Sequence, residues 1–96
     1  MVEHVSIATT QREMLETLIK AALAREKQTL ALGIARTRAR LAEFEQRFEM
    51  TSAEFERQLL AHELVETPEF TDWRMELGML RLLEAQSQAL EEAHID

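Results

Sequence analysis

Apolar positions recur through the first half of the chain at spacings of three, four and seven residues. The row consists of Leu15, Ile19, Leu23, Leu30, Ile34, Leu41, Phe44 and Phe48. This spacing places the side chains on one face of an α-helix, which only Gly33 disfavours. The segment Thr10-Gln11-Arg12-Glu13 has the form of a capping box, whose threonine and glutamate satisfy the first backbone N–H groups of a helix. The pattern predicts one helix over about 10–49, roughly 60 Å long.

A corner is predicted in the stretch FEQRFEMTSAEFERQLL, residues 44–60, where a second capping box, Thr51-Ser52-Ala53-Glu54, separates two similar phrases. Met50 and Phe55 flank this cap at the positions of a hydrophobic staple, which fixes the angle between the helices. We expect a phenylalanine-packed corner and a short helix over 52–63, with Phe55, Leu59 and Leu60 on its inner side. Thr67-Pro68 predicts a third helix over 68–93, because proline is favoured at the first helical position.

The third predicted helix carries two apolar stripes. Phe70, Trp73, Leu77 and Leu80 form one, and Met75, Met79, Leu82, Leu83 and Leu90 form the other. One long helix can cover a single stripe, and the short helix has only about three turns. We therefore expect the second stripe to remain exposed; the alternative is that the first two helices share both stripes within a monomer. Trp73 is either a core residue or an interface anchor.

Together these patterns predict an all-α fold and one helical domain over residues 1–96. The third helix should return antiparallel along the C-terminal part of the first, with the short helix as the corner. Residues 1–8 and 94–96 are expected to fray. Because the third helix is shorter than the first, about 14 residues of the first helix should project beyond it.

The projecting part of the first helix indicates a homodimer. It carries Leu15, Leu18, Ile19 and Leu23, an apolar row that a monomer would leave in water. We predict that two copies pair as an antiparallel, coiled-coil-like helical bundle, with Gly33 near the crossing. The alternative for Gly33 is a tolerated weak point in the helix, about as plausible as a close approach of helices.

The composition of the 96 residues narrows the class of protein further. There is no cysteine, so a disulfide framework and a thiolate metal site are excluded, and the chain suits a reducing cytoplasm, where we expect it to reside. The N-terminus lacks a charged leader followed by an apolar run, and no window holds 18 consecutive apolar residues. We therefore expect neither a signal peptide nor a membrane span.

Charge is distributed unevenly. Residues 1–50 contain 8 Lys and Arg against 7 Asp and Glu, or +1, whereas residues 51–96 contain 3 against 11, or −8. Nucleic-acid binding is not expected, because it requires a basic face. The one basic cluster, Arg36, Arg38 and Arg40, either contacts phosphates or forms ion pairs on a solvated helix surface, which the glutamates that follow it favour.

The acidic half of the chain is predicted to bind a basic protein. Glu69, Asp72 and Glu76 lie between the two stripes and would border an exposed strip of Met75, Met79 and Leu82. Charges at a rim steer a partner, and buried anchors supply most of the affinity. The alternative is a solvated acidic surface that only aids solubility.

No pattern indicates a catalytic, cofactor or metal site. His4, His62 and His94 are far apart in the sequence, and there is no glycine-rich phosphate loop. His62 with Glu63 and Glu66 is the only cluster of note, and we interpret it as a solvated histidine near a helix end. We therefore predict a protein that is not an enzyme and needs no cofactor.

The segment RLAEFEQRFEMTSAEFERQLLAHEL followed by FTDWRMEL resembles the C-terminal part of small helical antitoxin-like proteins of bacterial and archaeal toxin–antitoxin modules. In that family a long helix ends in a phrase like FE-x-x-Y-G-M-T, a short helix of the form EEFE follows, and an acidic segment with a tryptophan opens the last helix. Met50, Thr51, Phe55 and Trp73 occupy matching positions within residues 30–83, whereas Glu49 stands where the family commonly has glycine.

The resemblance implies a function in protein binding. Its members are thought to bind a small toxin, often assigned as a ribonuclease, that a partner gene encodes. We therefore expect an antitoxin that neutralises a small basic toxin protein; the alternative is a homo-oligomeric structural or adaptor protein with no toxin partner. A neighbouring gene for a small basic protein would favour the first.

Overall fold

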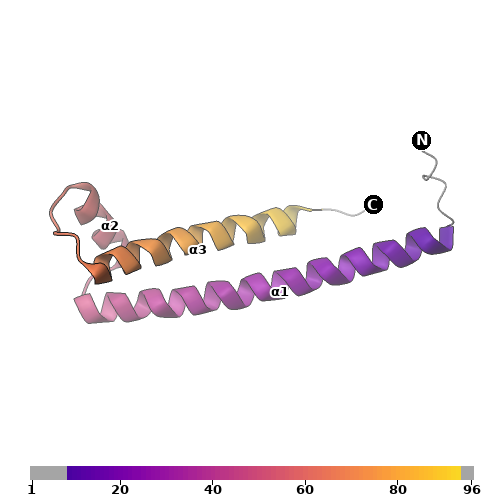
Figure 1. The fold of residues 1–96 in the computed structure, drawn as a ribbon, viewed down its shortest axis with the longest axis horizontal. Coiled ribbons are helices and arrows are strands. Elements are labelled where there is room, and N and C mark those ends of the chain that lie inside the picture. Colours follow the sequence, from indigo (N-terminus) through magenta and orange to yellow (C-terminus); the bar gives the residue numbers. More distant parts are fainter. Residues whose placement is uncertain (1–8, 94–96) are drawn as a thin grey trace.

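The computed structural model describes residues 9–93, which form three helices and, within that range, no strand (Figure 1). The long helix α1 (Thr9–Phe48) is followed by the short helix α2 (Ser52–Leu60), and α3 (Pro68–Glu92) returns antiparallel beside the C-terminal part of α1. The predicted all-helical class and the order of the helices are confirmed. The segments predicted to fray, 1–8 and 94–96, lie outside the described residues.

Both ends of α1 differ slightly from the prediction. The helix begins at Thr9, so Thr10 lies within its first turn rather than at its cap, and the predicted capping role of Thr10 is wrong. At the other end the N–H of Met50 donates to the carbonyl of Glu45 at 3.2 Å, and Glu49 has a φ of 53°. This is a Schellman ending, in which a left-handed residue reverses the chain.

The start of α2 is capped from two directions. The Thr51 side-chain oxygen accepts a hydrogen bond from the N–H of Glu54 at 3.1 Å, which confirms the predicted N-cap. The carboxylate of Glu54 does not reach back to the cap and accepts instead from Arg57. Glu45 of α1 supplies a second cap, because its carboxylate accepts from the N–H of Ser52 at 2.8 Å. The corner therefore joins the end of α1 directly to the start of α2.

Helix α2 ends at Leu60, three residues earlier than predicted. The backbone N–H of His62 donates to the carbonyl of Leu59 at 3.1 Å, and that of Glu63 donates to the carbonyl of Gln58 at 2.9 Å. His62 has a φ of 57°, in the left-handed region. Leu60 is 83% exposed, so its predicted place on the inner side is wrong. Its position is 140° around the helix from Phe55, whereas Leu59 lies one turn beyond Phe55 on the same side.

Helix α3 begins as the sequence predicts. Thr67 is the N-cap, its side-chain oxygen accepts from the N–H of Phe70 at 3.0 Å, and Pro68 is the first helical residue. The helix ends at Glu92, one residue before the predicted end.

The hydrophobic core lies at the corner. Its buried residues are Leu41, Phe55, Trp73 and Leu77, and Phe44, Phe48, Met50, Leu59, Leu64, Phe70 and Leu80 pack around them. The rings of Phe55 and Trp73 are fully buried and stacked, with centroids 3.9 Å apart. The indole N–H of Trp73 donates to the hydroxyl of Ser52 at 3.0 Å, so burial leaves this donor satisfied. Trp73 is therefore a core residue, and the predicted phenylalanine corner is confirmed.

From the corner outward, α1 and α3 are joined by ion pairs. These are Arg47–Glu69 at 2.9 Å, Arg40–Glu76 at 3.3 Å, Arg38–Glu84 at 2.7 Å and Lys27–Glu91 at 3.9 Å. Arg38 and Arg40 therefore belong to a paired helix surface, as the sequence favours. Gly33 also lies in this contact, since a Cβ at Gly33 would be 3.4 Å from the Leu83 side chain. The close approach at Gly33 is thus made by α3 of the same chain.

The N-terminal part of α1 projects beyond α3, as predicted (Figure 1). Ala93, which follows α3, lies with Lys20, Leu23, Ala24 and Lys27 around a shallow hollow. The part of α1 before Lys20 therefore extends past the end of its neighbour.

Candidate protein-binding surface

Three apolar side chains are exposed on the outer side of α3. Met75 is 65% exposed, Met79 46% and Leu82 52%. Their spacing of four and three residues places them on one side of the helix, whose opposite side buries Trp73 and Leu77. We call these three residues the α3 strip.

The α3 strip is narrower than the predicted second stripe. Leu83 and Leu90 belong to that stripe in the sequence, but both are half-buried, and Leu83 reaches Gly33 of α1. The first stripe lies in or against the core. Helices α1 and α2 together thus cover the first stripe, and α1 also covers the edge of the second.

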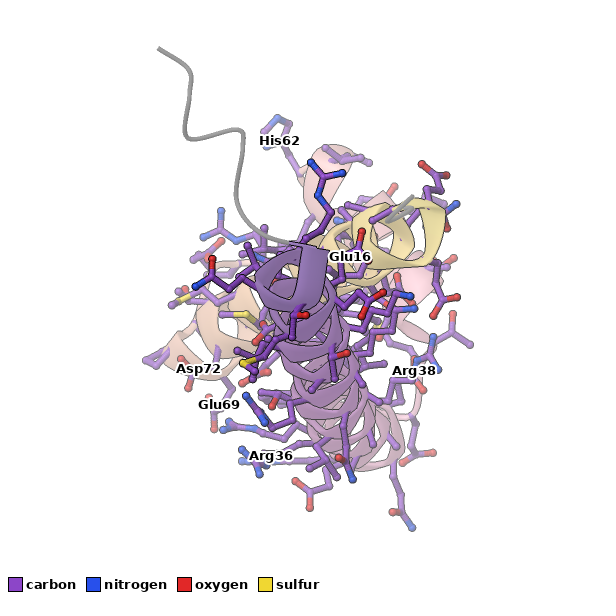
Figure 2. The ribbon with its side chains drawn as sticks, turned by 90° about the vertical axis from the view of Figure 1, so that its right-hand side faces the viewer. Glu16, Arg36, Arg38, His62, Glu69 and Asp72 are labelled. Atoms are coloured by element: carbon purple, nitrogen blue, oxygen red, sulfur yellow. The ribbon has the colours of Figure 1, made fainter. Side chains whose placement is uncertain are left out.

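The predicted acidic border of the strip is largely compensated. Glu69 and Glu76 form ion pairs with Arg47 and Arg40 of α1. Asp72 is exposed and forms no ion pair with any other residue in the range 9–93. Glu69 and Asp72 lie to the same side of α1 as Arg36, with Arg38 on the other side (Figure 2). Of the three acids, Asp72 is the one whose charge is not offset by a neighbouring arginine.

A second apolar surface lies beyond the other edge of α3, at the end of α2. Leu60 and Val65 are 83% and 82% exposed, and Leu60 and Leu59 line a shallow hollow with Arg74 and Arg81. The sequence reasoning missed this surface because it placed Leu60 inward. The 100° helical rotation from Leu59 to Leu60 is the signal that separates these two adjacent leucines.

The projecting part of α1 carries the third exposed apolar surface. Met14 and Leu18 are each 60% exposed, Leu15 49% and Ile19 40%. We call these four residues the α1 row. Met14 was not predicted, although it precedes Leu18 by one helical turn.

The structure divides the residues predicted for the dimer interface. Leu15, Leu18 and Ile19 lie together in the α1 row, whereas Leu23 is half-buried in the hollow beside Ala93. Gly33 lies farther along α1, in contact with Leu83. The α1 row therefore forms a surface of its own, separate from the α1–α3 contact.

The shifted pKa of Glu54 reflects an ion pair within α2 rather than a reactive group. Hydrogen bonds from Arg57, and then from Gln58, lower the pKa of Glu54 from its ordinary value of 4.5 to about 2. Glu54 is thus held as a carboxylate in the first turn of α2, where the helix dipole favours negative charge.

The residues around His62 do not gather into a site. Glu63 pairs with Arg57 at 3.1 Å, and Glu66 pairs with Arg74 at 2.9 Å. His62 itself is exposed at the left-handed end of α2. The two carboxylates therefore hold the α2–α3 connection.

Over residues 9–93 there is no group of three or more His, Asp or Glu side chains that could hold a metal ion. In the same range no helix is both long and apolar enough to cross a membrane. In comparisons with known proteins, no family model matches the chain, and no curated protein or solved structure is similar to it.

Proposed function

We propose that the chain is a non-enzymatic protein-binding module, an antitoxin that neutralises a small basic toxin through the α3 strip. The observation that carries the proposal is the exposure of Met75, Met79 and Leu82 on a helix whose other side is fixed by the core. Apolar side chains presented on a rigid element are the usual anchors of a protein interface.

The chemistry of the strip fits an apolar groove or helix face on the partner. Met75 to Leu82 span two helical turns, roughly 10 Å, which is the length over which a helix in a groove presents successive anchors. Two of the three side chains are methionines, which adapt to irregular surfaces. The formal charge of −7, and the 11 acids against 3 bases in residues 51–96, favour a basic partner.

Glu49 is the position at which the chain departs from the pattern of the antitoxin-like proteins. The φ of 53° at this residue lies in the left-handed region, which glycine adopts without steric cost. The family commonly has glycine at the matching place. The chain therefore departs from the family pattern in residue type while keeping the backbone conformation for which glycine is suited.

Affinity and association rate should depend on different residues. Glu69 and Glu76 hold α3 against α1, so their removal would disturb the scaffold as well as the charge. Asp72→Asn is the cleaner test of charge, and we expect it to slow association at low salt. Met79→Ala should mainly speed dissociation, by roughly tenfold if the side chain is an anchor worth about 1–2 kcal/mol.

The deciding experiment is co-expression with the small protein encoded by the adjacent gene. We expect that protein to arrest growth alone, and the two proteins to co-purify and growth to recover when this chain is present. Met79→Asp should abolish both effects, whereas the matched variant Leu60→Asp, on the exposed end of α2, should retain them. Failure of the two wild-type proteins to co-purify would refute the proposal, and equal effects of the two variants would refute the site.

A second candidate function is that of a homo-oligomeric structural or adaptor protein. The α1 row favours it, because those apolar side chains lie beyond the reach of α3. Self-association without any effect of the adjacent gene's product would favour this function over the first.

A further inference from the structure

Within residues 9–93, the α1 row lies where no other helix of the same chain packs against it. Ala93, which follows α3, lies beside Lys20 and Lys27, and the row lies before that point on α1. Four neighbouring apolar side chains that are 40–60% exposed form an unusual surface for a free helix. A helix segment also draws most of its stability from packing of its apolar face. Both considerations call for a covering partner.

The charges around the row are complementary to those of a second copy. Arg12, Ile19 and Glu26 are spaced by seven residues, so they lie on one face of α1. If a second α1 runs antiparallel with Ile19 level with its own copy, Arg12 comes level with Glu26 of that copy, and the reverse pair forms at the other end. The same register brings Glu13 level with Arg25.

A parallel arrangement would give the opposite result. Arg12 would then lie level with a second Arg12, and Glu26 with a second Glu26, and like charges at an interface are unfavourable. The pattern is thus self-complementary in the antiparallel direction only, with apolar residues at the centre and opposite charges at both ends.

We propose that two copies of the chain associate through the α1 row, antiparallel, with Ile19 at the two-fold axis and ion pairs between Arg12 of each copy and Glu26 of the other. Gly33 takes no part, because it serves the α1–α3 contact. The α3 strips lie outside this interface, toward the two ends of the dimer. The dimer therefore presents two α3 strips, one from each copy. Its formation does not depend on which protein binds them.

Sedimentation of the purified chain tests the proposal. We expect a dimer at tens of micromolar for the wild type and a monomer for Ile19→Lys. Leu32→Lys is the matched control, because Leu32 is 61% exposed on the same helix but lies outside the row. The control should keep the wild-type mass. Circular dichroism and the fluorescence of the buried Trp73 verify that each variant is folded.

Charge exchange tests the register separately. Arg12→Glu places two like-charged pairs in the dimer and should raise its dissociation constant on the order of tenfold. The double variant Arg12→Glu, Glu26→Arg restores both pairs with reversed sign and should return the constant to within about threefold of the wild type. Since the chain contains no cysteine, Ile19→Cys should be joined to its own copy by a short bismaleimide and Leu32→Cys should not.

Three results would overturn the proposal. A wild-type chain that stays monomeric at about 100 μM excludes the dimer, because even a weak dimer would be populated at that concentration. If Ile19→Lys and Leu32→Lys both sediment as monomers, the α1 row is excluded as the dimer interface. A double charge variant as weak as the single variant excludes the antiparallel register. These measurements use the isolated chain, so they fail or succeed independently of the proposed antitoxin function.

Discussion

Replacement of Glu49 by glycine should stabilise the protein. Glu49 follows the last residue of α1 and has a φ of 53°. In the left-handed region the Cβ of an L-residue crowds the following carbonyl, which costs roughly 1–2 kcal/mol. Glycine removes this cost but increases the conformational freedom of the unfolded chain, which offsets about 0.4–1 kcal/mol. The net gain is about 0.5–1 kcal/mol in the free energy of unfolding.

Two substitutions at this position separate the backbone from the charge. A carboxylate near the negative end of the α1 dipole is unfavourable, so Glu49→Ala should bring a small gain that disappears with added salt. Glu49→Gly should bring the same gain and also the conformational one. The difference between the glycine and alanine variants therefore measures the strain of the Cβ in the folded chain, less the added freedom that glycine gives the unfolded chain.

Urea denaturation followed through Trp73 is a suitable assay, because this residue is the only tryptophan and is fully buried. Thermal unfolding should show a rise of about 2–8 °C for Glu49→Gly. All variants must be compared at one protein concentration, since self-association would shift the midpoint. A glycine variant no more stable than the alanine variant would refute the predicted net gain, because the cost of the left-handed conformation would then not exceed the added freedom of the unfolded chain.

The remaining predictions concern the corner, the exposed side of α3 and the acid range. Ser52→Ala should cost about 1–3 kcal/mol, because it leaves the buried indole N–H of Trp73 without its acceptor; urea denaturation measures the loss. Gly78→Ala should raise stability by about 1 kcal/mol in the same assay, because a Cβ there meets no atom within 4 Å and alanine is the better helix former. The lowered pKa of Glu54, caused by Arg57, contributes stability that is complete above pH 4.5 and is lost as the pH falls towards about 2. Glu54→Gln should remove that part of the acid dependence, and an unchanged acid profile would contradict the assignment.

The helix starts at the corner could be predicted because the responsible residues act locally. Thr51 and Thr67 cap the helices that follow them, and Pro68 takes the first helical position. The start of α1 was misjudged because Thr10 and Glu13 match a capping box that the helix does not use. The same motif therefore marks a helix start at Thr51 and lies inside the helix at Thr10.

The end of α2 could not be predicted from residue type. A left-handed ending is usually marked by glycine, and here His62 takes that conformation. The compensation of the acidic border was also hidden, because Arg40 and Glu76 are 36 positions apart in the sequence and meet only through the register of α1 against α3. Long-range register depends on packing of the whole hairpin, which periodicity alone does not determine.

The candidate surfaces were predicted better than their chemistry. The projecting row follows from a comparison of helix lengths, because a shorter return helix leaves part of the first helix uncovered. The exposed strip follows from the two apolar stripes of the third helix, of which one neighbouring long helix can cover only one. Gly33 was assigned to an intermolecular crossing because small residues permit close approach, but the residue type does not say which helix approaches. Leu83 of the same chain is that neighbour.

The concentration of aromatic rings at the corner has a consequence for how the hairpin opens and forms. At the corner, the buried rings of Phe55 and Trp73 hold one end of the α1–α3 contact. The other end is held by the buried Leu30 and by the ion pair between Lys27 and Glu91 at 3.9 Å. The open end should separate first, so amide hydrogens near Lys27 and Glu91 should exchange with solvent faster than those near Leu41 and Leu77. Folding should proceed in the reverse order, since the ring contacts at the corner, such as Phe55–Trp73, join residues closer in sequence than the Lys27–Glu91 pair does. The contact between the two helices then extends outward from the corner.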